Sequence, residues 1–111
     1  MDQGEIHFVR LDSGPQPGIV VSSEAYNRGL YVLVVLCTAT RFEERSRIPS
    51  CVPFRAGEFG FAKDCVAQCE RVTLLSKSDL DSDIVGILDA LRMREVIRAI
   101  GLVMDSDCEP R

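Results

Sequence analysis

Tryptophan is absent from this sequence of 111 residues, histidine occurs once, and aromatic residues account for only 6% of the chain. Long hydrophobic runs are missing too, because the longest unbroken apolar segment, Leu30 to Cys37, is far shorter than the roughly 20 residues that span a bilayer. The first residues also lack the basic and then apolar layout of a signal peptide. We therefore expect a cytoplasmic protein with no membrane partner, in which Leu30 to Cys37 forms a buried central strand.

The rest of the composition is that of an ordinary globular protein. Hydrophobic residues make up 46% of the chain and charged residues 27%. A chain of this length buries well over half of its unfolded surface in one core, and no repeat or low-complexity stretch interrupts the sequence. The sequence therefore predicts a single domain over residues 1–111.

The net charge is acidic but unevenly distributed. The formal value of −4 argues against a nucleic-acid partner, because phosphate binding depends mainly on lysine and arginine. Residues 1–40 carry −2, residues 41–63 carry +2 and residues 64–111 carry −4. The cations of the basic segment are Arg41, Arg45, Arg47, Arg55 and Lys63. This segment is either a solvated loop of mixed charge or a surface for an anionic partner.

Five cysteines raise the question of disulfide bonds and metal binding. A cytosolic protein rarely forms disulfides. The only short spacing joins Cys65 and Cys69, and no second Cys or His pair lies nearby to complete a tetrahedral zinc site. We expect buried, unreactive thiols and no metal or other cofactor, with Cys108 in the polar tail the most exposed and oxidisable.

Strand and turn signals alternate along the first forty residues. Gly4 to Leu11 predicts a strand, and Ser13 to Gly18, with two prolines and two glycines, predicts a stiff turn. Ile19 to Ser22 predicts a second strand. Ser23 to Asn27 is a short polar excursion, after which a strongly apolar strand ends in Thr38-Ala39-Thr40.

The second half of the chain predicts two further strands and a helix. Ser50 to Phe54 can only be an edge strand, because Pro53 cannot donate to a ladder. Asp64 to Leu75 returns to strand character, and the remainder reads as helix with Asp89 as a plausible N-cap. The apolar face of that helix is expected to consist of Met93, Val96, Ile97, Ile100 and Met104. Many short strands followed by one helix predict an α+β domain built on a small curled antiparallel sheet.

In this order of strands and turns, together with Phe59-Gly-Phe-Ala-Lys-Asp-Cys-Val66, the sequence resembles the MazF/PemK family of type II toxin–antitoxin toxins. The resemblance implies a small SH3-like antiparallel β-barrel with a C-terminal helix, of the type shared by CcdB and PemK. It also implies a metal-independent endoribonuclease that cleaves single-stranded mRNA. Because the Leu30 to Cys37 strand and the helix supply more apolar surface than one core needs, we expect a two-fold homodimer.

The resemblance also implies where the chemistry takes place. In the family, an Arg at the start of the second strand and a Thr or Ser at the end of the third handle the scissile phosphate, which the adjacent 2′-hydroxyl attacks. Thr38 occupies the Thr position, although a Thr at a strand end is also favoured by β propensity alone. Where family members usually have Arg-Pro, this chain has Gln16-Pro17. A neutral amide can hydrogen-bond a phosphate but carries no charge, so we expect a severe loss of rate unless another cation takes over.

Several residues are candidates to supply the missing charge or a proton. Arg41, just beyond Thr38, is the expected catalytic substitute, and Arg10 is close enough in sequence order to reach the same groove. Arg71 lies in Glu70-Arg71-Val72-Thr73, offset from a family arginine on the late strand. His7 is a candidate acid or base. RNA binding is expected from Arg10, Arg45, Arg47 and Arg71, each of which has an ordinary surface role as its alternative.

The partners implied by the resemblance are single-stranded RNA and a cognate antitoxin, in the family a disordered acidic peptide that fills the RNA groove. The Arg41 to Arg55 segment is expected to receive that peptide. CcdB relatives poison DNA gyrase through an aromatic motif after the helix, and the tail Asp105 to Arg111 has no aromatic residue, which argues against gyrase. The alternative function is a non-catalytic member of the same fold that binds another protein.

Overall fold

The structure is a computed structural model that describes residues 1–104. Its strands are β1 Glu5–Leu11, β2 Gly14–Val20, β3 Tyr31–Thr38, β4 Cys51–Phe54, β5 Cys65–Ser76 and β6 Gly86–Ile87. Its helices are α1 Phe42–Arg45 and α2 Ala90–Val103, with 3₁₀ turns η1 Tyr26–Arg28, η2 Glu58–Gly60 and η3 Lys77–Asp79. Within the described residues, no helix is long and apolar enough to cross a membrane.

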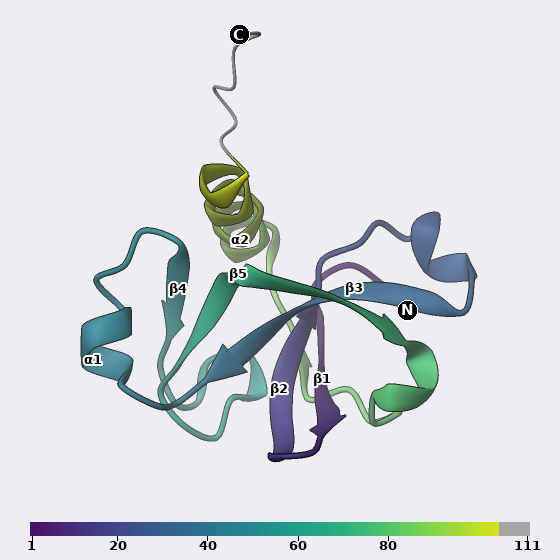
Figure 1. Cartoon of the computed structure of the whole chain (residues 1–111), viewed down its shortest axis with the longest axis horizontal. Coiled ribbons are helices and arrows are strands. Elements are labelled where there is room, and N and C mark those ends of the chain that lie inside the picture. Colours follow the sequence, from purple (N-terminus) through teal and green to yellow (C-terminus); the bar gives the residue numbers. More distant parts are fainter. Residues whose placement is uncertain (105–111) are drawn as a thin grey trace, which may run out of the picture.

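All six strands form one antiparallel sheet in the order β4-β5-β3-β2-β1-β6. Figure 1 shows β1 and β2 running steeply across β3 and β5, so that the sheet curls into a half-barrel with α2 standing over it. The α+β class and the curled antiparallel sheet with a C-terminal helix are therefore confirmed. The apolar strand β3 is central between β5 and β2, and β4, which contains Pro53, is an edge strand, as the sequence predicted.

Both faces of the sheet are buried, each in its own apolar cluster. Alternate residues of β3 divide between them, because successive side chains of a strand point to opposite faces. Val35 and Cys37 belong to the larger cluster, which α2 covers with Met93, Val96 and Ala99. The smaller cluster on the other face consists of Val9, Val20, Val32, Val34, Leu36 and Leu80. The four cysteines of the described residues are all buried and free, as expected, while Cys108 lies outside those residues.

The Gly/Pro-rich segment Ser13 to Gly18, predicted as a turn, was wrong: most of it forms the first half of β2. Pro15 and Pro17 pair with β1, opposite Arg10 and Phe8. Pairing of β2 with β3 begins only at Gly18, so the first half of β2 has a ladder partner on one side alone. Because proline has no N–H to donate, it is tolerated in a strand only where that donor is not needed. The tight reversal is therefore confined to residues 12 and 13.

The helical prediction for everything beyond Asp79 was also wrong in its first part. Residues 80–89 form a loop that contains the short strand β6 beside β1, and α2 begins only at Ala90. Asp89 is the N-cap, and its side chain accepts a hydrogen bond from the amide of Arg92 at 2.8 Å. Ile97 and Met104, which were expected on the apolar face, are exposed, whereas Ala99, which was not expected there, is buried in the core.

Candidate active site

An open pocket of about 290 Å³ lies where β2 and β3 diverge. The two strands pair from Gly18 onward, but the prolines of the first half of β2 do not pair with the C-terminal end of β3. The diverging ends of β2 and β3 leave a space between them. The turn that follows η2 forms the opposite wall of this space. Its lining residues are Phe8, Pro15, Gln16, Pro17, Cys37, Thr38, Ala39, Thr40, Gly60, Phe61, Ala62, Lys63, Cys65 and Val85.

Thr38 and Gln16, two of the predicted catalytic residues, are both brought to this pocket. Thr38 is mostly buried, and its Oγ1 accepts a hydrogen bond from the amide of Thr40 at 3.2 Å. A threonine hydroxyl has one proton to donate, so the Thr38 O–H remains free for a ligand. The Gln16 side chain spans the gap between the strands, with Nε2 donating to the carbonyl oxygen of Cys37 at 3.3 Å. Gln16 therefore keeps its Oε1 and its second N–H proton available.

The charge in the pocket comes from Lys63, which the sequence analysis placed in the basic segment but did not select as a site residue. Lys63 is exposed and follows Phe61, whose ring packs at 5.0 Å from that of Phe54 in the core. That packing fixes the turn that carries the lysine. Among the pocket-lining residues Lys63 is the sole cation, and no arginine contributes to the lining.

Arg41, the expected substitute for the missing arginine, lies outside the pocket lining. It is exposed and adopts a left-handed conformation with φ 55°, which turns the chain from β3 into α1. Arg45 ends α1 and Arg47 follows it, so all three stand on the protruding α1 segment that Figure 1 shows at one side of the sheet. None of the three forms an ion pair within residues 1–104. They form a cationic surface beside the pocket rather than part of its wall.

Arg10 and Arg71 are held by other groups. The guanidinium of Arg10 donates to the backbone carbonyls of Ser78 and Leu80, at 3.0 and 3.4 Å, which turns it toward η3. Arg71, on β5, donates to Gln68 Oε1 at 3.2 Å. The structure does not bring either arginine to Thr38.

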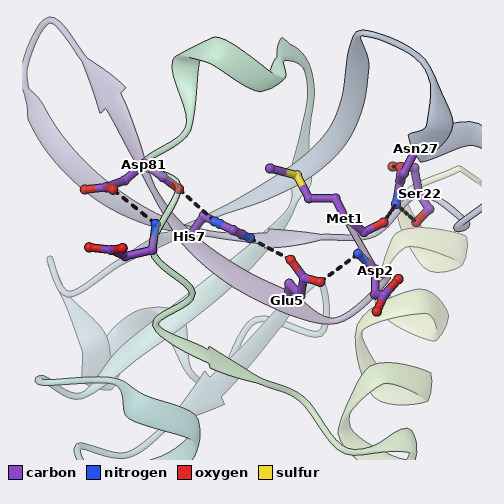
Figure 2. Close-up of polar contacts among 8 residues, drawn as sticks. Met1, Asp2, Glu5, His7, Ser22, Asn27 and Asp81 are labelled. Atoms are coloured by element: carbon purple, nitrogen blue, oxygen red, sulfur yellow. Dashed lines mark hydrogen bonds and ion pairs between the residues drawn. The ribbon is translucent and has the colours of Figure 1, made fainter.

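His7 is fully engaged in a structural network (Figure 2). Its Nδ1 lies 2.8 Å from the carbonyl oxygen of Asp81 and its Nε2 lies 2.8 Å from Glu5 Oε1. The side chain is 2% exposed and is not part of the pocket lining. The geometry therefore offers His7 no route to a substrate bound at Thr38.

Two buried thiols, Cys37 and Cys65, line the pocket floor. A hydrogen bond from Cys37 lowers the pKa of Cys65 below its usual value, against burial and the nearby Asp64 carboxylate, which act in the opposite direction. The same hydrogen bond, together with complete burial, raises the pKa of Cys37. Within residues 1–104, no three His, Cys, Asp or Glu side chains are placed to hold a metal ion.

Comparison with protein families decides what this fold and pocket belong to. The model of the PemK-like, MazF-like toxin family of type II toxin–antitoxin systems matches residues 2–104. The chain belongs to this family. No curated protein matches it at a significant level.

Solved structures similar to this MazF-like toxin support the fold. An endoribonuclease from a mycobacterial species, in complex with its cognate antitoxin, has a TM-score of 0.80 at 23% identity, over 99% of each chain. The Mycobacterium tuberculosis toxin MazF-mt6 has a TM-score of 0.77 at 24% identity, over 91% of this chain and 96% of its own. A MazE–MazF complex from Deinococcus radiodurans has a TM-score of 0.74 at 17% identity, over 94% of each chain.

Two of the residues that line the pocket of this MazF-like toxin were selected from the sequence. The end of the apolar strand marked Thr38, and the Gln-Pro pair marked Gln16, because both positions follow from strand order. Lys63 was missed as a site residue because it is distant in sequence and reaches the pocket only through the packing of Phe61. The sequence signal that could have identified it is the Phe59-Gly-Phe-Ala-Lys63 run, in which Lys63 comes two residues after the apolar Phe61.

Proposed function

We propose that this MazF-like toxin is a metal-independent endoribonuclease that cleaves single-stranded RNA at the pocket between β2 and β3. The observation that carries the proposal is the presence in one open pocket of a free threonine hydroxyl, a side-chain amide and a lysine ammonium. Hydrogen-bond donors and a positive charge are what a phosphorane transition state requires. Two similar solved structures, both from mycobacterial species, are endoribonucleases, in agreement with this chemistry.

Each polar residue has a distinct role in the proposed reaction. The 2′-hydroxyl attacks the adjacent phosphorus and gives up its proton to water, the bond to the 5′-oxygen breaks and that oxygen takes up a proton from water, and a 2′,3′-cyclic phosphate remains. The Thr38 hydroxyl donates to a non-bridging oxygen, and Gln16 positions the same phosphate through its free amide proton. Lys63 supplies the positive charge that a family member with Arg-Pro would provide at the start of β2.

The pocket also predicts a slow enzyme. Its lining contains no carboxylate and no imidazole, so no conventional general base faces the 2′-hydroxyl within the described residues. General acid–base catalysis contributes about 100- to 10,000-fold in enzymes that have it. We therefore expect a rate that depends on electrostatic stabilisation and on the alignment of the reacting groups.

The first test is RNA cleavage without metal. Purified protein is incubated with a long unstructured RNA in the presence of a chelator, and the products are separated on a denaturing gel. We expect discrete fragments ending in 2′,3′-cyclic phosphate, and about a 100-fold loss of rate in Thr38→Val and in Lys63→Met. Each variant removes a donor that acts in the transition state while keeping nearly the same shape.

Arg41→Ala is the matched control, because Arg41 carries the same charge beside the pocket but lies outside its lining. We expect its effect to be small and to disappear at high salt, as for a residue that contacts only the RNA backbone. Intact RNA with every protein would refute the nuclease. Loss of activity in Arg41→Ala but not in Lys63→Met would move the catalytic charge back to the arginine.

The proposed partner is an acidic antitoxin that binds the α1 segment. Arg41, Arg45 and Arg47 form no ion pair in the described part of the chain and outnumber the two carboxylates of α1, Glu43 and Glu44, so a carboxylate-rich peptide is complementary to this segment. Two of the similar structures are toxins in complex with their antitoxins. The absence of arginine from the pocket lining keeps a second function open, in which the chain acts by binding a protein. Intact RNA together with stable protein binding would select that function.

A further inference from the structure

Four buried cysteines lie within the described residues, and the pocket divides them into two pairs. Cys37 and Cys65 line the pocket, whereas Cys51 and Cys69 do not. All four are at most 6% exposed, so burial alone does not distinguish them. Cys65, which is 4% exposed, borders a space of about 290 Å³, far larger than the roughly 30 Å³ that one water occupies in the liquid, and Cys37 is fully buried behind it.

The two pocket thiols come from neighbouring strands. Cys37, on β3, pairs with Ala67 of β5, and Cys65 lies two residues before Ala67 on the same face. Each thiol is the largest single influence on the pKa of the other, as expected for side chains in contact. A register irregularity interrupts the β3–β5 ladder between Val35 and Cys37.

The electrostatics give the two sulfurs different reactivities. Cys65 has the lowered pKa and is the more readily ionised, while the pKa of Cys37 is raised. The thiolate is the form that reacts with oxidants and electrophiles. Burial raises the pKa of Cys69 to about 12 and also raises that of Cys51, which makes these two thiols poor nucleophiles.

We propose that Cys37 and Cys65 are a redox-active thiol pair, and that a small peroxide entering the pocket converts them reversibly into a disulfide. Cys65 is the attacking thiol and Cys37 the resolving thiol. The proposal concerns the chemistry of the pocket and does not require the chain to be a nuclease.

The reaction balances with hydrogen peroxide as the oxidant. The Cys65 thiolate attacks one peroxide oxygen, the O–O bond breaks, and hydroxide leaves and takes up a proton to become water. The resulting sulfenic acid is attacked by the Cys37 sulfur, which forms the S–S bond and releases a second water. Overall two thiols are oxidised, the peroxide is reduced, and the protein loses two hydrogen atoms. A thiol such as dithiothreitol reverses the step by exchange.

The bond would alter the candidate active site directly. An S–S bond is about 2.05 Å long, and Cys65 lies diagonal to Cys37 in the ladder, so forming the bond draws β3 and β5 together at this position. The carbonyl of Cys37 is the acceptor for Gln16 Nε2, and the next residue is Thr38. Oxidation is therefore expected to displace both polar side chains that Cys37 positions.

The test uses the full chain carrying Cys108→Ser, so that only the four described cysteines remain. The protein is treated with hydrogen peroxide, remaining thiols are alkylated, and the intact mass is measured before and after dithiothreitol. Before alkylation we expect a mass lower by two hydrogen atoms, restored by dithiothreitol, and after alkylation two fewer alkyl groups than in the untreated protein. Non-reducing tryptic mapping should join the peptides of residues 29–41 and 64–71, which contain Cys37 and Cys65.

The second peptide also contains Cys69, so Cys69→Ser is the decisive control. The cross-link must survive in Cys69→Ser and in Cys51→Ser and must vanish in Cys37→Ser and in Cys65→Ser. Melting under reducing conditions verifies that each variant folds, and the map of the parent protein does not depend on any of them. No mass change, a cross-link through Cys51 or Cys69, or over-oxidised Cys65 without a cross-link would each overturn the proposal.

Discussion

Glu5 is a buried carboxylate whose partners determine its charge. Burial by itself would raise its pKa, but hydrogen bonds from His7 and from the amide of Asp2, with the charge of the N-terminus, bring the pKa of Glu5 below its usual value. His7 Nδ1 faces a carbonyl, which can only accept, so that nitrogen must carry a proton. The other ring nitrogen, Nε2, lies 2.8 Å from Glu5 Oε1, and the Asp2 amide donates to Glu5 Oε2 at 2.8 Å, so both oxygens of the carboxylate are engaged (Figure 2).

Replacing Glu5 by Gln should destabilise the protein by about 1.5–3 kcal/mol at neutral pH, because the carboxylate that His7 and the Asp2 amide contact is removed and hydrogen bonds to a charged group are the stronger ones. A lowered folded-state pKa contributes stability above the unfolded pKa, and this contribution is lost as the pH falls through the folded value. The difference between the two proteins should therefore shrink in acid. Urea denaturation at neutral pH and again below the folded pKa of Glu5 measures both quantities. Glu24→Gln, at an exposed site, is the control and should change nothing.

At the same scale, the sequence predicted residues whose position depends on strand order and missed residues positioned by tertiary contacts. Thr38 is the last residue of a strand that the apolar run of the sequence predicts, and in the structure Thr38 lines the pocket. The fate of Arg10 was not predictable, because its acceptors are carbonyls nearly seventy residues away. The same holds for His7, whose partner Asp81 lies in a loop that the sequence presented as helix.

Among the elements, the crossing of η2 and β6 shapes one wall of the pocket. Gly60 has φ +86°, and Gly86 passes so close to the turn that a Cβ there would overlap the carbonyl oxygen of Phe59. Two backbone segments can approach this closely only where glycine, which has no Cβ, lies at the contact. The crossing holds Phe61 and Val85 against the pocket.

Gly86→Ala should therefore push η2 away from β6 and lower the free energy of unfolding by about 1–3 kcal/mol, the usual cost of overpacking. Chemical denaturation measures the loss. Gly29→Ala is the matched control, because Gly29 has negative φ and a Cβ there would come no closer than 3.8 Å to its nearest neighbour. Equal stability of the two variants would show that the crossing yields without strain.

Strands were predicted correctly where their own hydrophobic pattern marks them. They were missed where only pairing with a neighbouring strand makes a segment a strand. The apolar run of β3 and the Pro53 edge strand were both found. The proline-rich half of β2 was taken for a turn because its composition is that of a turn, whereas β1 supplies a ladder that accepts prolines. The two residues of β6 carry no periodic signal, and they are a strand only because β1 lies beside them.

At the scale of the whole molecule, one end of the sheet carries exposed apolar side chains. Leu30 and Tyr31 at the start of β3 are 75% and 51% exposed, and Leu74 of β5 is 55% exposed beside the Leu33 cross-strand pair. Leu33 and Leu74 lie opposite each other on the same face as the cluster under α2. The apolar face thus continues past the helix that covers it, which favours the dimer expected from the sequence.

Light scattering after size exclusion should give twice the mass of one chain. Leu74→Lys should weaken this dimer by about tenfold or more, since burying a leucine is worth at least the 1.4 kcal/mol that a tenfold change requires. Ile48→Lys, at an exposed apolar residue whose amide donates to the carbonyl of Arg45 at the end of α1, should leave the dimer intact. A monomeric parent protein would remove the dimer, and equal effects of the two variants would place the interface elsewhere.

Strand β1 joins the two ends of the chain, because β2 flanks it on one side and β6 on the other. The amides of Val85 and Leu88 donate to the carbonyls of Ile6 and Gly4, at 2.8 and 2.9 Å. During synthesis on a ribosome, β1 is made well before β6, because Glu5 pairs with Ile87 and Ile6 with Gly86. Contacts of such long sequence separation slow folding. The toxin therefore cannot complete its sheet until β6 has left the exit tunnel, and until then this edge of β1 has no strand partner.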